Sequence, residues 1–300
     1  MKHIIYILGL ISFISCSNSD IDFERASLIV NNQKIELLTA NEIFENYLIK
    51  KSDYLSNVIS HIENEFLENA EYPFIIESIK TEITPDEKLF GFTEKIKNID
   101  FKKLTEPFLN KIIAELPGPD TKILFIPSNP AFVDFFRNYQ IGVTAITVGT
   151  GKIIVSIDPT SNNWQEQLPY VLAHEYHHSV WTSRNFKTKD FTPLEYLIFE
   201  GRADSFAKQL YPEVNSPWTN MINQVEEKKV WKIIKPELNK RETKMNDLMM
   251  IGNDEIPYCS GYTIGFNIVK KFKENNPNIN DKSLIDMEPE IILELSEYEK

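Results

Sequence analysis

The chain has 300 residues, of which 42% are hydrophobic and 25% charged, and its 44 acidic and 32 basic residues give a formal net charge of -12 at pH 7. Because nucleic-acid binding relies on Lys and Arg to neutralise phosphates, this charge excludes nucleic acid as the expected partner. The apolar fraction is typical of a globular protein with a core, and the length allows one large domain or two smaller ones.

An apolar run near the N-terminus predicts an export signal. Residues 4–14 are mainly apolar, follow Lys2 and His3, and are too few to span a bilayer as a stable helix. The run leads into Cys16 and resembles a bacterial lipoprotein signal, in which cleavage before the cysteine is followed by attachment of lipid to its thiol. We therefore expect residues 1–16 to form the signal, Cys16 to be lipidated, and the chain to be anchored to a bacterial membrane outside the cytoplasm. The alternative is an ordinary secretory signal in which Cys16 has no role.

The region from residue 17 to residue 120 is predicted to be mainly helical. Residues 26–30 and 35–38, separated by two asparagines, favour a small hairpin at its start. Apolar positions then recur at intervals of three and four within residues 41–70 and 104–116, which is helical spacing. This region contains no cluster of residues suited to metal binding or nucleophilic catalysis, so we assign it a supporting role.

Composition changes after residue 120. The apolar run 122–127, and the runs 143–148 and 152–157 on either side of a Gly-Thr-Gly turn, predict a small sheet that ends in a hairpin. An exposed edge of such a sheet can bind an extended peptide as an added strand. Plain core packing is an equally good interpretation of this hairpin.

The stretch His174-Glu175-Tyr176-His177-His178 holds three of the five histidines of the chain. A helix turns by about 100° per residue, so His174 and His178 lie on one face and can share a metal ion. Glu175 would stand beside the metal, where a base is needed to take a proton from a metal-bound water. His177 points away from that face and is interpreted as structural or surface. The helix is predicted to begin between residues 164 and 168, with Pro169 in its first turn.

A second helix supplies the candidate third ligand. Thr192 followed by Pro193 and Glu195 is the signature of a helix start. Glu200, two turns into this helix, would complete a His, His, Glu set, since a catalytic zinc typically has three protein ligands. Asp204, one turn further on the same face, would accept a hydrogen bond from the far nitrogen of a ligating histidine. The alternative makes Glu200 and Asp204 a solvated acidic face, and Glu195 is the second-choice ligand.

Two further features concern the same region. Gly201 costs about 1 kcal/mol relative to Ala inside a helix, and we interpret it as a close approach to the helix that carries His174. Tyr262 is the candidate donor to the oxyanion that develops on a scissile carbonyl, with Arg202 as a weaker candidate and core packing as the alternative role of the tyrosine.

The C-terminal part is predicted to be mainly helical. We predict helices at residues 216–236, 262–272 and 290–298, with an irregular segment at 241–257.

The motifs carry a family resemblance. His174-Glu175-x-x-His178, followed after 21 residues by Glu200-Gly201-Arg202-Ala203-Asp204, resembles the gluzincin zinc peptidases. Together with Gly261-Tyr262-Thr263-Ile264-Gly265, the pattern is similar to the YjaZ-like family of predicted zinc-dependent proteases, a domain of unknown function. The resemblance covers about residues 120 to 275. It implies an α+β fold, with a small sheet packed on the ligand helices, and hydrolysis of peptides.

These observations define the expected protein. We predict an α+β, mostly helical chain with a small sheet packed on the HExxH helix, a zincin-like catalytic domain at residues 121–300, and one Zn²⁺ held by His174, His178 and Glu200. The expected function is that of a membrane-anchored, extracytoplasmic zinc metallopeptidase that acts on peptide or protein substrates with Glu175 as general base. One alternative is a surface lipoprotein that uses a peptidase-like fold for binding or assembly without catalysis. Another is zinc-dependent hydrolysis of a non-peptide or cell-wall amide.

Overall fold

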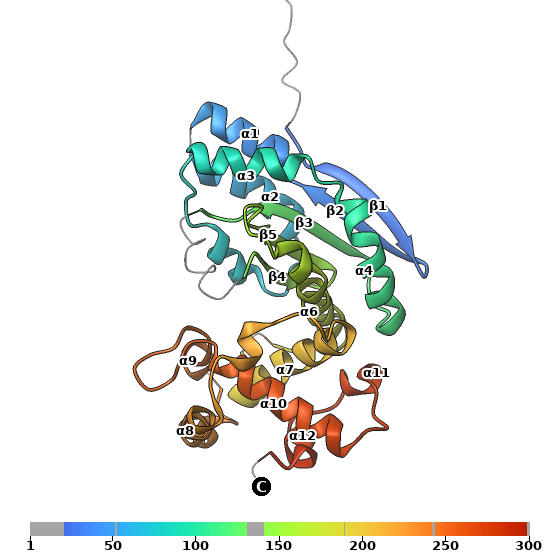
Figure 1. Cartoon of the computed structure of the whole chain (residues 1–300), viewed down its shortest axis with the longest axis vertical. Coiled ribbons are helices and arrows are strands. Elements are labelled where there is room, and N and C mark those ends of the chain that lie inside the picture. The colour runs from blue at the N-terminus through green and yellow to red at the C-terminus, as the bar shows by residue number, and fades with distance from the viewer. Residues whose placement is uncertain (1–20, 52, 131–140, 189, 242–243, 299–300) are drawn as a thin grey trace, which may run out of the picture.

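The computed structural model describes residues 21–51, 53–130, 141–188, 190–241 and 244–298. Within these residues the chain is rich in helix and contains a five-stranded mixed sheet (Figure 1), which confirms the predicted α+β class. The expected signal, with Cys16, lies outside the described residues. Among the helices of the described part, none combines the length and the apolar character needed to cross a membrane.

The described sheet has the strand order β1-β2-β3-β5-β4, so β1 and β4 are its edges. The pairs β1–β2 and β4–β5 are antiparallel hairpins, as predicted, while β2–β3 and β3–β5 are parallel. Because β2 pairs with β3, one sheet joins residues on both sides of the boundary expected between residues 120 and 121. The strands are β1 (Glu24–Val30), β2 (Gln33–Thr39), β3 (Thr121–Pro127), β4 (Val143–Gly149) and β5 (Lys152–Ile157).

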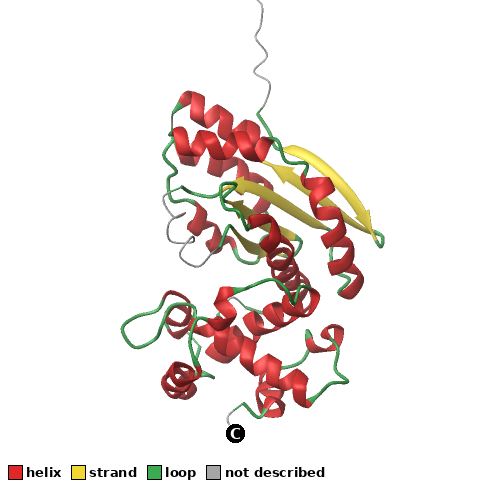
Figure 2. Ribbon diagram, viewed as in Figure 1, coloured by secondary structure: helices red, strands yellow, loops and turns green. Residues whose placement is uncertain are grey.

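Helices cover both faces of this sheet (Figure 2). In β3, Ile123 and Phe125 belong to a core shared with helices α4 and α6, whereas Leu124 and Ile126 belong to a core shared with α1 and α2. A strand that is buried on both faces needs apolar residues at consecutive positions, which explains the unbroken run in β3. The N-terminal helical elements are α1 (Asn41–Lys50), the π-helix η1 (Leu55–Ile59), α2 (Ser60–Phe66), the 3₁₀ helix η2 (Pro73–Ile79), α3 (Glu87–Lys97) and α4 (Phe101–Glu115).

Helix α6 (Trp164–Asn185) carries the histidine motif and packs against β4, β5 and helix α7 (Pro193–Leu210). Pro169 is its sixth residue, so the expectation that this proline falls in the first turn was wrong. A proline at this position removes one backbone hydrogen bond and crowds the preceding turn. Burial of the helix against the sheet and α7 outweighs that cost, since most helix stability in proteins comes from tertiary packing.

The C-terminal part is built from helices. The expected single helix at 216–236 was wrong, because Asn223 caps a new helix and forms a capping box with Glu226. The segment 241–257, expected to be irregular, contains helix α9. The elements are α7 (Pro193–Leu210), η3 (Pro217–Asn220), α8 (Gln224–Ile234), η4 (Lys235–Glu237), α9 (Met245–Ile251), α10 (Ser260–Asn275), α11 (Asp281–Leu284) and α12 (Pro289–Ser296).

The backbones of helices α7 and α10 approach each other closely. A Cβ atom added to Gly201 would overlap the backbone oxygen of Gly265, and one added to Gly265 would overlap the backbone oxygen of Leu197. Gly201 therefore serves a close approach to α10, and the expected approach to the HExxH helix was wrong. Two glycines that face each other let the two helix backbones touch, which positions Tyr262 of α10 beside α7.

Replacing Gly201 with alanine is expected to lower the free energy of unfolding by roughly 1–3 kcal/mol, because overpacking forces the two helices apart. Gly91 of α3 is the matched control, since a Cβ atom there meets nothing within 4 Å. Its replacement by alanine should stabilise the protein by about 0.5–1 kcal/mol through the better helix propensity of alanine. Urea unfolding of both variants measures the difference, and equal stabilities would contradict the proposed contact.

Candidate metal centre

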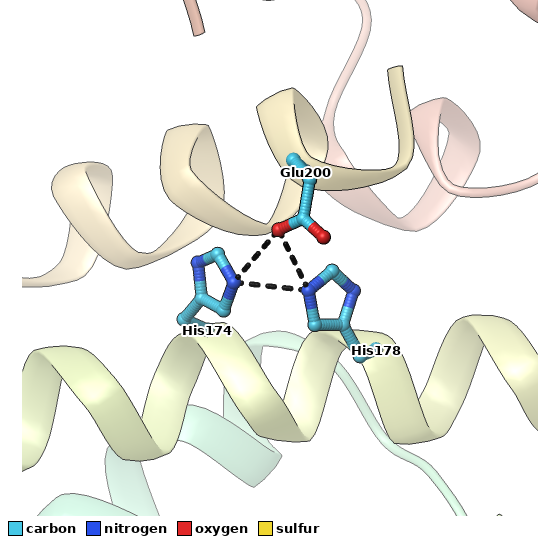
Figure 3. A group of neighbouring side chains, drawn as sticks. All are labelled: His174, His178 and Glu200. Atoms are coloured by element: carbon cyan, nitrogen blue, oxygen red, sulfur yellow. Dashed lines mark hydrogen bonds and ion pairs between the residues drawn. The ribbon is translucent and has the colours of Figure 1, made fainter. Parts of the chain in front are cut away.

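Three side chains from two helices converge on one point. His174 and His178 rise from α6, one turn apart, and Glu200 approaches them from α7 (Figure 3). The Nε2 atoms of the histidines are 2.9 Å apart, and each lies 3.3 Å from Oε2 of Glu200. All three residues are buried. Within the described part of the chain, these are the residues whose ligand atoms are grouped as in a metal site.

The donor set and its spacing fit a zinc ion. A tetrahedral zinc with ligand atoms at about 2.0–2.1 Å separates neighbouring ligand atoms by about 3.3 Å, which is close to the separations of 2.9–3.3 Å found here. Two imidazoles and one carboxylate are the ligands of a catalytic zinc site that keeps one position open. The geometry can therefore hold a metal, with His174, His178 and Glu200 as its protein ligands.

Asp204 supports the first histidine, as the sequence suggested. Its Oδ1 lies 3.1 Å from Nδ1 of His174, so the ring is oriented with Nε2 toward His178 and Glu200. Asp204 is fully buried one turn after Glu200. A carboxylate on the far nitrogen fixes the tautomer of a ligating histidine and raises its basicity.

The second histidine is held differently. The ring of His178 stacks on the ring of Phe199, with centroids 3.9 Å apart and an interplanar angle of 17°. Its Nδ1 has no hydrogen-bond partner among the described residues. Trp181 and Phe191 pack edge-on around Phe199. The orientation of His178 thus depends on aromatic packing.

The charges of the site are coupled. Burial by itself would lower the pKa of His174, but the Asp204 carboxylate, with Glu200 and Glu175, raises this pKa well above its ordinary value. Burial by itself would raise the pKa of Glu200, but His178 and His174 lower it to about 2. Glu200 is therefore ionised at neutral pH and ready to bind a cation.

Glu175 is positioned by the edge strand. Thr147 of β4 has its Oγ1 at 2.8 Å from both the backbone oxygen and Oε2 of Glu175. A hydroxyl donates one hydrogen bond at a time, so Thr147 can hold either oxygen of Glu175 but not both at once. Glu175 is 8% exposed and, together with His174, lines a pocket.

The pocket lies between β4, α6 and α10, and encloses roughly 220 Å³. Tyr262 lines it, with its ring centroid 6.4 Å from that of His174. Burial, followed by the charge of Glu200, raises the pKa of Tyr262 well above its ordinary value, so its hydroxyl keeps its proton. Apart from His174 and Glu175 the lining side chains are uncharged, namely Ile141, Val143, Thr144, Ala145, Val171, Trp218, Met221, Met250, Tyr258, Cys259 and Tyr262.

Three other candidates have different roles. Glu195 forms a capping box with Thr192 at the predicted helix start and also accepts a hydrogen bond from Arg241, so it is occupied away from the metal site. Arg202 donates to the backbone oxygens of Ile285 and Met287, which rules it out as the oxyanion donor. The ring of His177 is buried beside Phe206, in line with a structural role.

Comparison with known proteins agrees with this geometry. A family model described as predicted Zn-dependent protease (DUF2268) matches residues 101–294, well over half of the chain. The chain belongs to the DUF2268 family. This membership confirms the resemblance to the YjaZ-like proteases. The match covers β3, β4, β5 and all the helices from α4 to α10, and thus includes every residue of the metal site.

Two relatives of this DUF2268 chain come from Bacillus subtilis (strain 168), and both are named as uncharacterized proteins. YjfC is 28% identical over 149 residues, which cover 45% of this chain and 50% of YjfC. YjaZ is 30% identical over 106 residues, which cover 34% of this chain and 41% of YjaZ. The chain thus spans half or less of the length of these relatives. No solved structure matches it.

Zinc binding by this DUF2268 protein is expected to strengthen as the pH rises. His174 must release a proton before its Nε2 can bind metal, and its raised pKa retains that proton above the ordinary histidine value of about 6.5. Each pH unit below the raised pKa should weaken binding by up to about tenfold. Chelator competition at several pH values measures the slope. Asp204→Asn should flatten it, and a wild-type affinity that does not change with pH would contradict the assignment.

Several residues of the site carry no local signal in the sequence. Thr147 contacts Glu175, Phe199 stacks on His178, and Tyr170 and Trp218 both contact Asp204, and all of these contacts arise from tertiary packing. A strand threonine or a helix phenylalanine is common in any core, so none of them stands out in a single sequence. Phe199 stands directly before Glu200, and Tyr170 stands one turn before His174 on the same helix, so these two lie beside recognised residues.

Proposed function

We propose that this chain is a zinc metallopeptidase that hydrolyses peptide bonds. The observation that carries the proposal is the convergence of His174, His178 and Glu200 within 3.3 Å of one another, beside the carboxylate of Glu175 at the wall of a pocket. Membership of a family of predicted Zn-dependent proteases supports it. A purely structural metal site would need no base, so the placement of Glu175 also favours catalysis over a binding or assembly role.

Zinc bound to these ligands would act as a Lewis acid and lower the pKa of a coordinated water to about 7. Glu175 accepts the proton of the attacking water on its carboxylate and passes it to the leaving amine. Thr147 lies 2.8 Å from Oε2 of Glu175 and, when it donates to this oxygen, restricts the rotation of the carboxylate at the pocket wall. Tyr262, whose hydroxyl stays protonated, is the proposed donor to the oxyanion of the scissile carbonyl.

The substrate is proposed to be an extended peptide. β4 is a sheet edge that borders the pocket through Val143, Thr144 and Ala145. A free edge can pair with an extended backbone, and pockets beside it then select side chains. The largely apolar lining favours an apolar side chain next to the scissile bond.

The test is cleavage of a broad peptide library by the zinc-loaded protein, with products identified by mass spectrometry. Cleavage that stops on chelation and returns with zinc is the expected result. Stoichiometric zinc without cleavage of peptides, together with capture of one stoichiometric partner, would favour the binding role. Release of fragments from peptidoglycan, with peptides left intact, would indicate that the substrate is a cell-wall amide.

We also propose that the protein acts outside the cytoplasm, anchored by lipid on Cys16. The support is the short apolar run at residues 4–14 that leads into this cysteine. Metabolic labelling with a fatty acid, in bacterial cells that express the full chain, should label the wild type and not Cys16→Ser. Equal labelling of both, or labelling of neither, would contradict the anchor.

A further inference from the structure

We propose that Trp218 is a positioning residue that holds Asp204 against His174 and thereby sets the affinity of the site for zinc. The inference rests on the metal site of the proposed function. Trp218 belongs to η3, an element that contributes no metal ligand. Its indole N–H donates to Oδ1 of Asp204 over 2.7 Å. No local sequence pattern links the two residues.

Asp204 accepts its side-chain hydrogen bonds through only one of its two carboxylate oxygens among the described residues. Its Oδ1 is contacted by Trp218 Nε1 at 2.7 Å, the Tyr170 hydroxyl at 3.0 Å and His174 Nδ1 at 3.1 Å. Its Oδ2 is buried and has no hydrogen-bond partner among the described residues. Nothing on the second oxygen fixes the rotation of the carboxylate, so the three donors on Oδ1 set its direction. The indole makes the shortest of these contacts.

Trp218 is itself held in place. The hydroxyl of Thr263, on α10, donates to the backbone oxygen of Trp218 over 3.0 Å and accepts from the backbone N–H of Met221 over 3.0 Å. The indole ring meets the ring of Tyr170 edge-on, with centroids 5.7 Å apart. The backbone of Trp218 is therefore held by α10 and its ring contacts Tyr170 of α6, so the position of the indole N–H does not depend on Asp204 alone.

Trp218 also faces the substrate side. Its side chain is half-buried and lines the pocket with His174, Glu175 and Tyr262. Tyr170, the other neutral donor to Asp204, is buried and is not part of that lining. Trp218 is thus the donor to Asp204 that an apolar substrate group in the pocket would also touch. The Trp218 side chain therefore both lines the pocket and donates a hydrogen bond to Asp204, which supports the proposed ligand His174.

The first test compares the zinc affinity of Trp218→Phe with that of the wild type by chelator competition. Phenylalanine keeps an aromatic wall but removes the N–H, and loss of an outer-shell partner typically weakens metal binding about 10–100-fold. We expect a loss in this range. Trp231→Phe is the matched control, because Trp231 packs on Tyr298 of the C-terminal tail and should change the affinity by less than about twofold.

A double-mutant cycle shows whether Trp218 acts through Asp204. In the background of Asp204→Ala, which removes the acceptor, adding Trp218→Phe should weaken zinc binding by less than about twofold. An unchanged affinity in the single variant, or the same loss in both backgrounds, would overturn the proposal. Wild-type protein that binds no zinc would overturn the proposed function as well. Zinc binding without peptide cleavage would overturn only the peptidase activity.

A measurement on unsubstituted Trp218 covers the case in which Trp218→Phe fails to fold. In a nitrogen-15 NMR spectrum, an indole N–H bonded to a carboxylate should resonate downfield of the other tryptophan side chains and exchange slowly with solvent. Asp204→Asn should shift that resonance upfield. Four indole signals at ordinary positions in the wild type, all unaffected by Asp204→Asn, would overturn the contact on which the proposal depends.

Discussion

Replacing Glu175 with glutamine is expected to abolish peptide hydrolysis and leave zinc bound. Glutamine preserves the shape of the side chain and can still contact Thr147, but it cannot accept a proton from water. A positioned general base typically contributes about 10²–10⁴-fold to the rate, so kcat should fall by at least about 100-fold. The zinc content should stay at the wild-type level, because Glu175 is not one of the three converging ligands.

Glu166→Gln is the matched control for this variant. Glu166 lies in the first turn of the same helix and is exposed, so its replacement makes the same chemical change outside the site. It should retain both activity and zinc. Full activity of Glu175→Gln would remove Glu175 as the base, and loss of zinc from that variant would make Glu175 a ligand instead.

Replacing Glu200 with alanine is expected to have the second large effect, on zinc binding itself. The variant leaves two imidazoles and no anionic ligand at a site where Glu200 is ionised at neutral pH. The affinity for zinc should fall by more than the roughly 10–100-fold that an outer-shell partner costs. Activity should fall with it. Competition with a chelator of known affinity measures the change.

Glu195→Ala is the control that separates the loss of zinc affinity in Glu200→Ala from a general destabilisation of helix α7. Glu195 is the other acidic candidate on the helix, and its capping box with Thr192 should make its loss cost about 1 kcal/mol of stability. Zinc affinity should remain close to that of the wild type. The opposite pattern, with zinc lost from Glu195→Ala and kept by Glu200→Ala, would assign the third ligand to Glu195.

The residues of the candidate metal site were predictable because their signals are local. The spacing of His174 and His178 places them on one helix face, and the cap at Thr192 sets where the next helix begins, so Glu200 and Asp204 follow by counting turns. The two hairpins were equally readable from turn residues. At Asn31 and Asn32 the backbone has positive φ angles of 49° and 67°, a conformation that asparagine tolerates and a tight hairpin turn requires.

What could not be predicted depends on contacts between distant segments. The sequence shows that Gly201 needs room, but not that the neighbour is Gly265 of α10. Periodicity cannot show that β2 pairs with β3 across more than 80 residues. The stacking of Phe199 on His178 and the hydrogen bond from Trp218 to Asp204 also could not be predicted. An aromatic residue in a helix or turn is compatible with many partners. Tertiary packing also overrode the local preference at Pro169.

The most direct test of the metal site is X-ray diffraction from zinc-loaded crystals of the protein, with data collected on both sides of the zinc absorption edge. The anomalous difference map locates the metal independently of any assumption about its ligands. We predict one strong peak per chain, within about 2.0–2.2 Å of the Nε2 atoms of His174 and His178 and of a carboxylate oxygen of Glu200. No peak between these three side chains, or a zinc held elsewhere in the chain, would contradict the assignment of the site.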